Sequence, residues 1–244
     1  MSENHILIIG ASSAIGCEII RRIADDSTVI LAHYHTGRER LEALQSEVHG
    51  LIVPIRGDLS SEEGVNVLIE TVAFHCHAPR KIVFLAAPRL TMVRFKDLSW
   101  QDFRHHSEMQ LRTAVMLLGR FLPKMANSGY GRVVFMLSSV TIGVPPATMA
   151  HYVTAKHALL GLMRALASEY AAKRITVNAV SPSMVETDFL LDIPEKIVEL
   201  AAQQHPLKRN AIPADLASVV KMLLSDEAGY LTGANIPITG GIQF

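Results

Sequence analysis

Short aliphatic runs alternate with longer amphipathic stretches along most of the chain. The runs are rich in Val, Ile and Leu with little polar alternation, which is typical of strands buried on both faces of a parallel sheet. They predict strands at residues 5–10, 27–34, 49–58, 81–87, 131–139, 174–182 and 235–241. Apolar residues at helical spacing predict helices within residues 16–25, 37–48, 62–74, 109–126 and 214–226.

This alternation of strands and helices predicts an α/β fold. We expect one doubly wound, Rossmann-like parallel sheet of seven strands, with right-handed crossovers that place helices on both faces. No internal repeat, low-complexity tract or Pro/Gly/Ser-rich linker divides the sequence. Residues 1–244 are therefore expected to form a single domain, large enough to bury a substantial core.

The chain carries 23 basic and 23 acidic residues, so its formal net charge is zero. This balance argues against a nucleic-acid or anionic membrane surface. Cys17 and Cys76 lack paired spacing, which indicates a reducing compartment, and the His75-Cys76-His77 run lacks the further ligands that a metal site needs. The N-terminus is too short and polar for a signal peptide, and no apolar stretch approaches the ~18 residues of a membrane span. We expect a cytoplasmic protein.

The loop after the first predicted strand, within IIGASSAIGCEII, carries the first candidate site. Gly10 can turn sharply, and Gly16 allows the following helix to approach the strand closely. Ser12 and Ser13 offer hydroxyls beside free backbone N–H groups at a helix N-terminus, which attracts a pyrophosphate. An ordinary strand-to-helix turn is the alternative. The position of the loop between a buried strand and an amphipathic helix favours a dinucleotide site.

The end of the second predicted strand bears on the choice of cofactor. An Asp or Glu there would bind the ribose hydroxyls of NAD, and the sequence has neither. Thr36 and Arg38, helped by His33 or His35, can instead contact a 2′-phosphate, which favours NADP(H) over NAD(H). Arg38 is alternatively a solvated helix residue. Asp58, after the third strand, can lie beside the adenine ring and also cap a helix.

Tyr152 and Lys156 are the strongest catalytic candidates, because residues at i and i+4 lie on one face of a helix. A fixed ammonium favours the phenolate and is expected to lower the Tyr pKa from its usual ~10. Such a Tyr can exchange a proton with a substrate oxygen that a Ser hydroxyl orients. Ser139 is the expected serine, and the adjacent Ser138 competes for the role.

With the glycine loop, Ser139, Tyr152 and Lys156 in this order, the chain resembles the short-chain dehydrogenase/reductase family, and most closely its 3-oxoacyl-carrier-protein reductase branch. The resemblance runs from about residue 5 to the end. The family's glycine motif, T-G-x-x-x-[AG]-x-G, is matched by Gly10, Ala14 and Gly16, with Ile9 in place of the Thr. Residues 206–241 also resemble the family's C-terminal segment, which completes the sheet and forms an oligomer contact.

The resemblance implies a role for each matched residue. Tyr152 would be the general acid/base, Lys156 would hold the nicotinamide ribose, and Ser139 would position the carbonyl. Gln110 stands where the family has an Asn that anchors a proton-relay water. The expected cofactor contacts are Gly10, Ser12, Ser13, Ile15, Gly16, His33, Thr36, Arg38, Asp58, Leu59, Ala86, Ala87, Tyr152, Lys156, Pro182, Val185 and Thr187.

The implied activity is NADPH-dependent reduction of a ketone. Residues 187–210 follow the sixth predicted strand, and their apolar side chains are expected to cover an apolar substrate such as a 3-oxoacyl thioester, free or bound to a carrier. The enzyme is expected to be a homotetramer or homodimer.

Beyond Ile9, the sequence departs from the family at three further places. The family's N-N-A-G after strand 4 is replaced by Leu85-Ala86-Ala87-Pro88, its P-G after strand 6 is Pro182-Ser183, and its Asn is Gln110. Pro88 also removes a backbone donor. These changes support an alternative, in which the chain is a weakened, cofactor-binding subunit that assembles with a second, active reductase.

Overall fold

The computed structural model of the protein describes residues 4–243 and has one sheet of seven parallel strands. The order across the sheet is β3-β2-β1-β4-β5-β6-β7. The strands are β1 (Asn4–Ile9), β2 (Thr28–Tyr34), β3 (Leu51–Arg56), β4 (Lys81–Phe84), β5 (Gly131–Met136), β6 (Ile175–Pro182) and β7 (Asn235–Ile238). The predicted fold class is confirmed. Residues 1–3 and 244, which the single-domain prediction includes, lie outside the described part of the chain.

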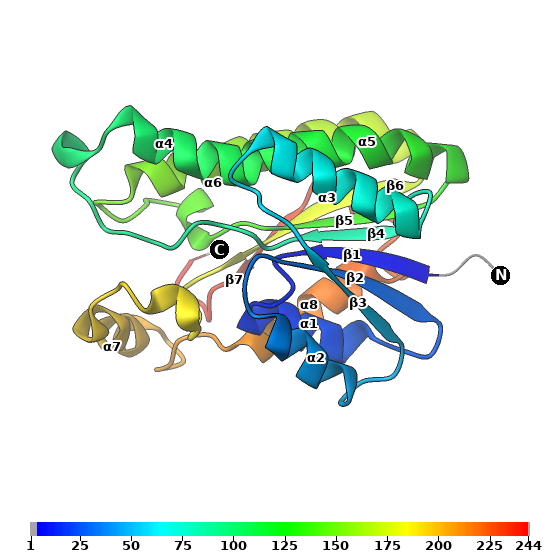
Figure 1. Ribbon diagram of the computed structural model, residues 1–244. Helices are drawn as coiled ribbons and strands as arrows, with labels where there is room; N and C mark the ends of the chain where they lie inside the picture. Colours follow the sequence, from blue (N-terminus) through cyan, green and yellow to red (C-terminus); the bar gives the residue numbers. More distant parts are fainter. Residues whose placement is uncertain (1–3, 244) are drawn as a thin grey trace.

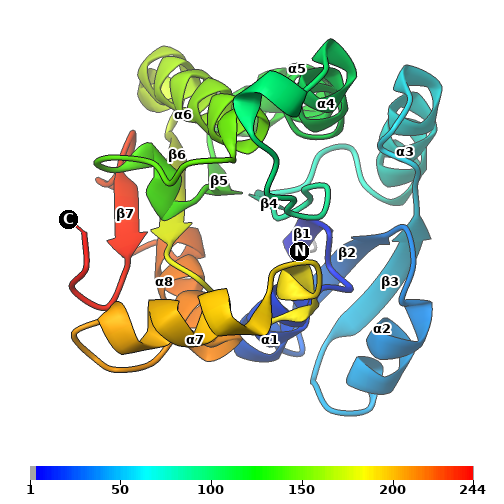
Figure 2. The same cartoon turned by 90° about the vertical axis from the view of Figure 1, so that its left-hand side faces the viewer.

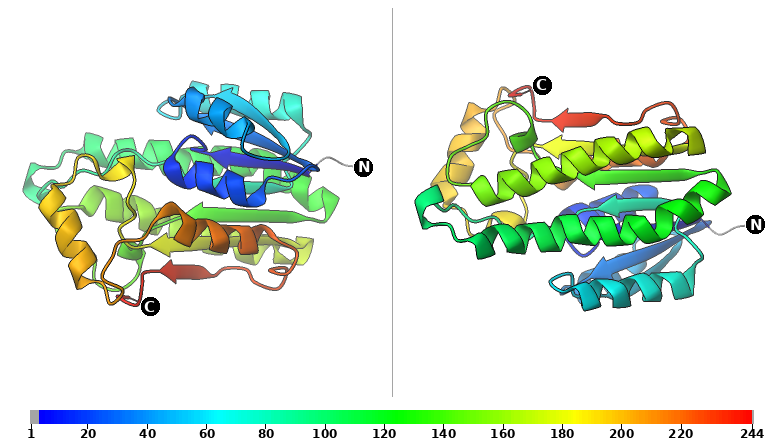
Figure 3. Two further views of the ribbon diagram at one scale, coloured as in Figure 1. Left: turned by 90° about the horizontal axis from the view of Figure 1, so that it is seen from below. Right: turned by 90° about the horizontal axis from the view of Figure 1, so that it is seen from above.

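Helices cover both faces of the sheet, as Figures 1 and 3 show. Helices α1, α2 and α8 lie on one face, and α3, α4, α5 and α6 lie on the other. The helices are α1 (Ala14–Ile23), α2 (Arg38–Gln45), α3 (Glu62–His75), α4 (Trp100–His106), α5 (Thr113–Ser128), α6 (Ala150–Tyr170), α7 (Glu195–Gln204) and α8 (Pro213–Leu224). A π-helical turn, Ser107–Arg112, joins α4 to α5, so α5 begins later than the predicted helix at 109–126.

Two hydrophobic cores fix the sheet between these layers. Side chains of a strand alternate between faces, so Leu7 and Ile9 of β1 enter the core under α3, α5 and α6. Ile6 and Ile8 enter the opposite core under α1, α2 and α8. All four side chains are at most 1% exposed, which explains why the strand is apolar at every position rather than at alternate ones.

Local signals in the sequence set the helix ends. Ser13 caps α1 by accepting a hydrogen bond from the Gly16 N–H, and Ser61 caps α3 by accepting from the Gly64 N–H. At the other end of a helix, Gly129 closes α5 in a left-handed conformation with φ of 66°. The Ser13 and Ser61 caps follow β1 and β3 at the carboxyl edge of the sheet, whereas Gly129 precedes β5 at the opposite edge.

The strand order reverses between β1 and its neighbours β2 and β4, which is where doubly wound sheets bind ligands. Figure 2 looks onto this carboxyl edge, with α7 lying across it. The connection that leads from β6 to α7 includes a short 3-10 helix, Asp188–Leu190. Within residues 4–243, no helix is both long and apolar enough to cross a membrane, and no group of three or more His, Cys, Asp or Glu side chains is arranged to hold a metal ion.

Candidate active site

Tyr152 and Lys156 lie one turn apart on α6 and point into the fold at the carboxyl edge of the sheet. Both are buried, with exposures of 6% and 3%. The Lys156 Nζ donates a 2.8 Å hydrogen bond to the Met136 carbonyl at the end of β5. The same Nζ lies 5.6 Å from the centre of the Tyr152 ring. The predicted pair therefore forms one buried unit that is anchored to the sheet.

The expectation of a lowered Tyr pKa is wrong for this structure. Burial raises the pKa of Tyr152 to about 12, and a hydrogen bond with the Ser138 side chain opposes this only in part. Burial also lowers the pKa of Lys156 to about 7, because the ammonium is taken out of water. Desolvation is the largest cause of both pKa shifts, and the attraction between the two groups contributes to neither.

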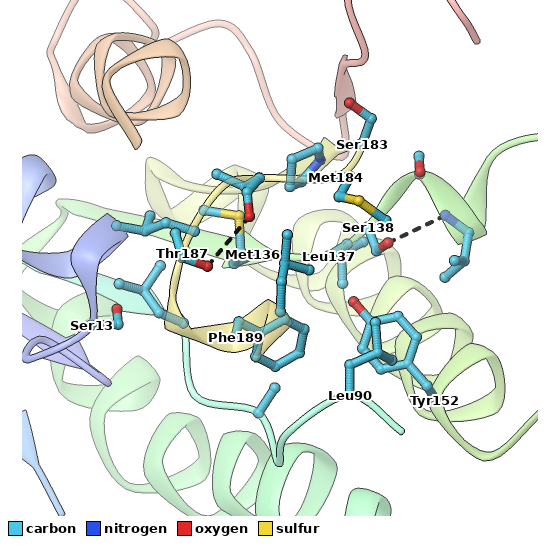
Figure 4. Close-up of a pocket in the computed structure, with 18 of the residues that line it drawn as sticks. Ser13, Leu90, Met136, Leu137, Ser138, Tyr152, Ser183, Met184, Thr187 and Phe189 are labelled. Atoms are coloured by element: carbon cyan, nitrogen blue, oxygen red, sulfur yellow. Dashed lines mark hydrogen bonds between the residues drawn. The ribbon is translucent and has the colours of Figure 1, made fainter. Parts of the chain in front are cut away.

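The serine beside Tyr152 is Ser138. Figure 4 shows its hydroxyl next to the Tyr152 hydroxyl, and it accepts a 3.4 Å hydrogen bond from the Val140 N–H. Strand β5 ends at Met136, and Leu137, which is 2% exposed, turns into the core. This turn directs the next side chain, Ser138, toward the cavity.

Ser139, the serine that the sequence predicts to act with Tyr152, also lines the cavity but is not the serine beside the tyrosine hydroxyl. It is the first residue of the 3-10 helix Ser139–Thr141, which Ser138 caps. The sequence spacing of thirteen residues before Tyr152 therefore selects the neighbour of the serine that the fold presents to the tyrosine hydroxyl.

The glycine loop has the shape predicted for a phosphate site. Gly10 has a φ of +86°, and a Cβ there would lie 3.0 Å from the Ala86 backbone N. A Cβ on Gly16 would lie 2.4 Å from the Ala11 carbonyl oxygen, so Gly16 allows α1 to pack on the loop. The first turn of α1 faces the cavity through Ser13 and its successors Ala14 and Ile15.

His33 does not have the predicted role at a 2′-phosphate. Its Nδ1 accepts a 3.1 Å hydrogen bond from the Gly10 N–H, so its Nε2 carries the proton and lies 3.3 Å from the Gly57 carbonyl. Burial lowers the pKa of His33 to about 4. A neutral imidazole with both nitrogens engaged is a support for the glycine loop rather than an anion ligand.

Arg40, rather than Arg38, is the cation at the cavity. Arg38 points to solvent and donates a 2.7 Å hydrogen bond to Glu42. The Arg40 guanidinium lies over the cavity and donates at 2.6 Å to Asp188, across the cleft. Residues two apart on a helix point in different directions, and the sequence does not reveal where α2 begins relative to the cavity.

The remaining predicted residues line two adjoining hollows. The first holds Ser138, Tyr152 and Lys156, and its wall includes the predicted contacts Ile15, Pro182, Val185 and Thr187. The second holds the predicted contacts Gly10, Ser12, Thr36, Asp58, Leu59 and Ala86. Both include Ser13, Ala87, Arg40, Asp188 and Phe189, so they form one cleft along the carboxyl edge. Gly16, Arg38 and Gln110 lie outside its walls.

The cleft fits an elongated dinucleotide. The glycine loop and Arg40 lie where its two hollows meet, so that backbone donors and a cation face the middle of a bound molecule. In the first hollow, which also holds Lys156, the Ser183 Oγ is buried without a hydrogen-bond partner among residues 4–243, and it offers a donor and an acceptor to the carboxamide of a nicotinamide. The small side chains of Ala86 and Ala87 leave the path open.

The part of the cleft beyond Tyr152 is apolar. Leu90, Val140, Met149 and Ile193 form a buried cluster with Tyr152, and Phe189 packs against it. Figure 4 shows Leu90, Tyr152 and Phe189 of this group. The charged residues that line the first hollow, within the described chain, are Lys156 and the Arg40–Asp188 pair. Pro146 and Met149 also line the hollow, whereas the nearby Val144 is 88% exposed.

Gln110 does not line the cleft and lies beside His106 instead. It belongs to the π-helical turn and is 3% exposed. Its Nε2 is 3.3 Å from the Nδ1 of His106, a histidine that the sequence suggests is solvated or at an interface but that is buried in the fold. A histidine four residues before the glutamine, on the same helical face, was the available signal.

The chain matches known proteins over nearly its full length. A family model described as enoyl-(acyl carrier protein) reductase matches residues 10–243. The 3-oxoacyl-[acyl-carrier-protein] reductase FabG of Pseudomonas aeruginosa is 33% identical, in an alignment that covers 97% of this chain and 96% of that protein. The protein of the same name from Rickettsia felis is 31% identical over 97% of this chain and 95% of its own length.

Solved structures resemble the fold equally well. Levodione reductase superposes with a TM-score of 0.89 at 25% identity, over 99% of this chain and 98% of its own. A Beutenbergia cavernae protein, described as an NAD(P)-dependent gluconate 5-dehydrogenase and holding NADP at low occupancy, superposes with a TM-score of 0.90 at 27% identity, over 99% of this chain and 97% of its own.

Proposed function

The chain belongs to the short-chain dehydrogenase/reductase family, and we propose that it is an NADPH-dependent carbonyl reductase of that oxidoreductase family. One observation carries the proposal. Tyr152 and Lys156 are buried, with the half-buried Ser138 beside them, where a dinucleotide-shaped cleft meets an apolar pocket. A proton donor, a cation and an orienting hydroxyl at that junction are what ketone reduction requires of the protein.

The bound cofactor would supply the hydride, and the protein supplies the proton. Tyr152, with its pKa raised to about 12, carries its hydroxyl proton at neutral pH and is the general acid. Ser138 and Tyr152 both donate to the carbonyl oxygen and stabilise the alkoxide that develops on it. Lys156, with its pKa lowered to about 7, can take up and release a proton near neutral pH, and its ammonium form favours the phenolate.

The substrate is proposed to be a 3-oxoacyl thioester or a related apolar ketone. The wall of Leu90, Met149 and Phe189 buries an acyl chain or ring, while the first hollow offers an anionic substrate few cations. Two reductases that are 33% and 31% identical to this chain are named for 3-oxoacyl groups on acyl carrier protein, which supports a carrier-bound substrate. Arg40 and the lack of an acidic residue at the end of β2 support NADP(H).

A second candidate is a weakly active subunit that binds the cofactor and assembles with an active reductase. The tethering of the Gln110 amide to His106 favours it, because the relay expected of that residue would then rest on its Oε1 alone. Under either candidate we propose a cytoplasmic homo-oligomer, a tetramer or dimer, to which the second candidate adds a partner reductase.

The test is reduction of a panel of 3-oxoacyl thioesters and uncharged ketones, followed by loss of reduced-nicotinamide absorbance, with cofactor binding measured separately. Reduction that Tyr152→Phe abolishes, with cofactor affinity retained, supports the reductase. Tight NADPH binding without reduction of any ketone would reject the first candidate and favour the second. Reduction by the Ser138→Ala variant at the wild-type rate would remove that serine from the mechanism.

A further inference from the structure

Two buried histidines, His106 and His151, lie beside Tyr152 and outside the cleft. His106 is the last residue of α4 and His151 directly precedes Tyr152 on α6, with exposures of 3% and 2%. Their ring centres lie 4.7 Å apart at 77°. Neither histidine takes part in the proposed reaction. Burying two imidazoles is costly unless their nitrogens form hydrogen bonds.

Gln110 decides the orientation of the first imidazole. Its Nε2 lies 3.4 Å from the His106 carbonyl oxygen and 3.3 Å from the His106 Nδ1. A carbonyl oxygen only accepts, so the amide nitrogen, and not the amide oxygen, faces His106. The Nδ1 is then an acceptor, and the ring proton is on Nε2. Residues 106 and 110 are one turn apart, which is the spacing that allows this bond.

The surroundings keep this imidazole neutral. Burial lowers the pKa of His106 to about 4, and the nearby His151, His105 and Lys156 lower it further. Asp102 opposes the shift more weakly. At neutral pH the ring therefore has one fixed tautomer and no charge, and it can act only through hydrogen bonding and packing.

The locked ring packs on Tyr152. The two ring centres are 6.0 Å apart at 82°, an edge-to-face arrangement that aromatic rings favour. The Tyr152 ring also contacts Phe189 of the short helix Asp188–Leu190, with ring centres 6.5 Å apart. The phenol thus lies between a side chain of the substrate-side connection and an imidazole whose own orientation is set by Gln110.

We propose that His106 is a positioning residue for Tyr152, held in its Nε2-protonated tautomer by Gln110, and that the two residues act as one unit. The positioning of a catalytic acid rests on the proposed function, whereas the tautomer does not. In the same arrangement, the Gln110 Oε1 is turned away from His106 and has no partner among the described residues. The histidine therefore fixes the direction of the one amide atom still available for a proton relay.

Nuclear magnetic resonance of isotope-labelled histidine nitrogens tests the tautomer without any substrate. His106→Phe identifies the signal by its loss. We expect the His106 signal of the wild-type protein to be that of a neutral, Nε2-protonated ring, and we expect Gln110→Leu to convert it to a mixture of tautomers. A ring protonated on Nδ1, a charged ring at neutral pH, or a signal that Gln110→Leu leaves unchanged would overturn the proposal.

Steady-state kinetics test the coupling. His106→Phe keeps a flat ring against Tyr152 but removes the Nδ1 acceptor, and Gln110→Leu removes the amide. We expect each to lower kcat about 10- to 100-fold, as small displacements of catalytic groups do, with KM and cofactor affinity unchanged. The double variant should be no slower than the slower single variant. His157→Phe, at an exposed histidine of the same helix α6, is the matched control.

The outcomes separate this proposal from the proposed function. Additive losses in the double variant, or single variants with the wild-type kcat, would overturn the joint action of His106 and Gln110. Thermal unfolding of each variant identifies a loss caused by misfolding. If the wild-type protein reduces no ketone, the proposed function fails, and the histidine spectra still decide whether Gln110 fixes the ring.

Discussion

Arg40 donates a 2.6 Å hydrogen bond to Asp188 across the mouth of the cleft. The bond joins α2, beside the glycine loop, to the connection that follows β6 on the substrate side. Both side chains line both hollows, and both remain partly exposed. Asp188 therefore binds the Arg40 guanidinium, and a phosphate of the cofactor would compete with Asp188 for it.

Replacing Arg40 should weaken cofactor binding. We expect Arg40→Ala to raise the Kd for NADPH about 10- to 100-fold, since a charge-assisted hydrogen bond contributes about 1.5–3 kcal/mol. Arg38→Ala, at the solvent-facing neighbour, is the matched control and should leave the Kd unchanged. Titration calorimetry with NADPH and NADH measures both variants. A loss confined to NADPH would assign Arg40 to the 2′-phosphate, and equal losses would assign it to the pyrophosphate.

Removing the Tyr152 hydroxyl should abolish turnover without loss of the fold. We expect Tyr152→Phe to lower kcat about 100- to 10,000-fold, the usual contribution of general acid catalysis, while NADPH affinity changes little. The phenyl ring still fills the buried site, so the melting temperature should stay close to that of the wild-type protein. Stopped-flow measurement of a single turnover checks that the proton-transfer step is the one affected.

The two adjacent serines should differ in effect. Ser138→Ala removes the hydroxyl that faces Tyr152, and we expect kcat/KM to fall about 100-fold or more. Ser139→Ala removes a hydroxyl at the start of a 3-10 helix, and its effect should be below about tenfold. The same assay measures both variants. A larger loss for Ser139→Ala would restore the assignment that sequence spacing favours.

The buried His33 should make the protein less stable in acid. Its pKa is lowered from 6.5 to about 4, so between these values the unfolded chain binds a proton that the folded chain does not. The free energy of unfolding is then highest above pH 6.5 and falls as the pH drops toward 4, by about 3 kcal/mol for a fully buried group.

Urea unfolding of His33→Asn, which removes the titrating ring, checks this pH dependence. The variant should lose less stability than the wild-type protein over the same pH range, whatever its stability at neutral pH. His49→Asn, at a histidine whose side chain is 86% exposed, should retain the wild-type slope. An unchanged slope in His33→Asn would show that this imidazole is accessible to protons in the folded state.

The glycines make a matched pair for stability. A Cβ on Gly16 would lie 2.4 Å from the Ala11 carbonyl oxygen, so we expect Gly16→Ala to cost about 1–3 kcal/mol. A Cβ on Gly161, in the middle of α6, would meet nothing within 4 Å. There the alanine should stabilise the helix by about 0.5–1 kcal/mol. Thermal and urea unfolding should therefore give opposite signs for the two variants.

The sheet was predictable because a strand that is buried on both faces needs apolar residues at every position, which gives a continuous apolar run in the sequence. The glycine loop was predictable for a related reason, since Gly10 and Gly16 each lie against backbone atoms that leave little room for a side chain. Both signals are local. They survive without knowledge of what lies elsewhere in the chain.

The corrected residues depend on contacts that no local pattern contains. The choice of Ser138 follows from the burial of Leu137 after β5 ends, and the choice of Arg40 from the position of Asp188, which is 148 residues away. His33 is a support because the Gly10 N–H points at it. The direction of the Tyr152 pKa shift follows from how deeply α6 buries the ring, which spacing alone does not give.

The buried amine of Lys156 has a chemical consequence beyond its place beside Tyr152. With its pKa lowered to about 7, a substantial fraction of this side chain is a free amine at neutral pH, whereas an ordinary lysine near ~10.4 has a free-amine fraction of roughly one in a thousand or less. The unprotonated amine is the nucleophile, so small acylating reagents should modify this side chain ahead of the surface lysines. Its labelling rate would then report, residue by residue in a mass spectrum, when the cleft is occupied.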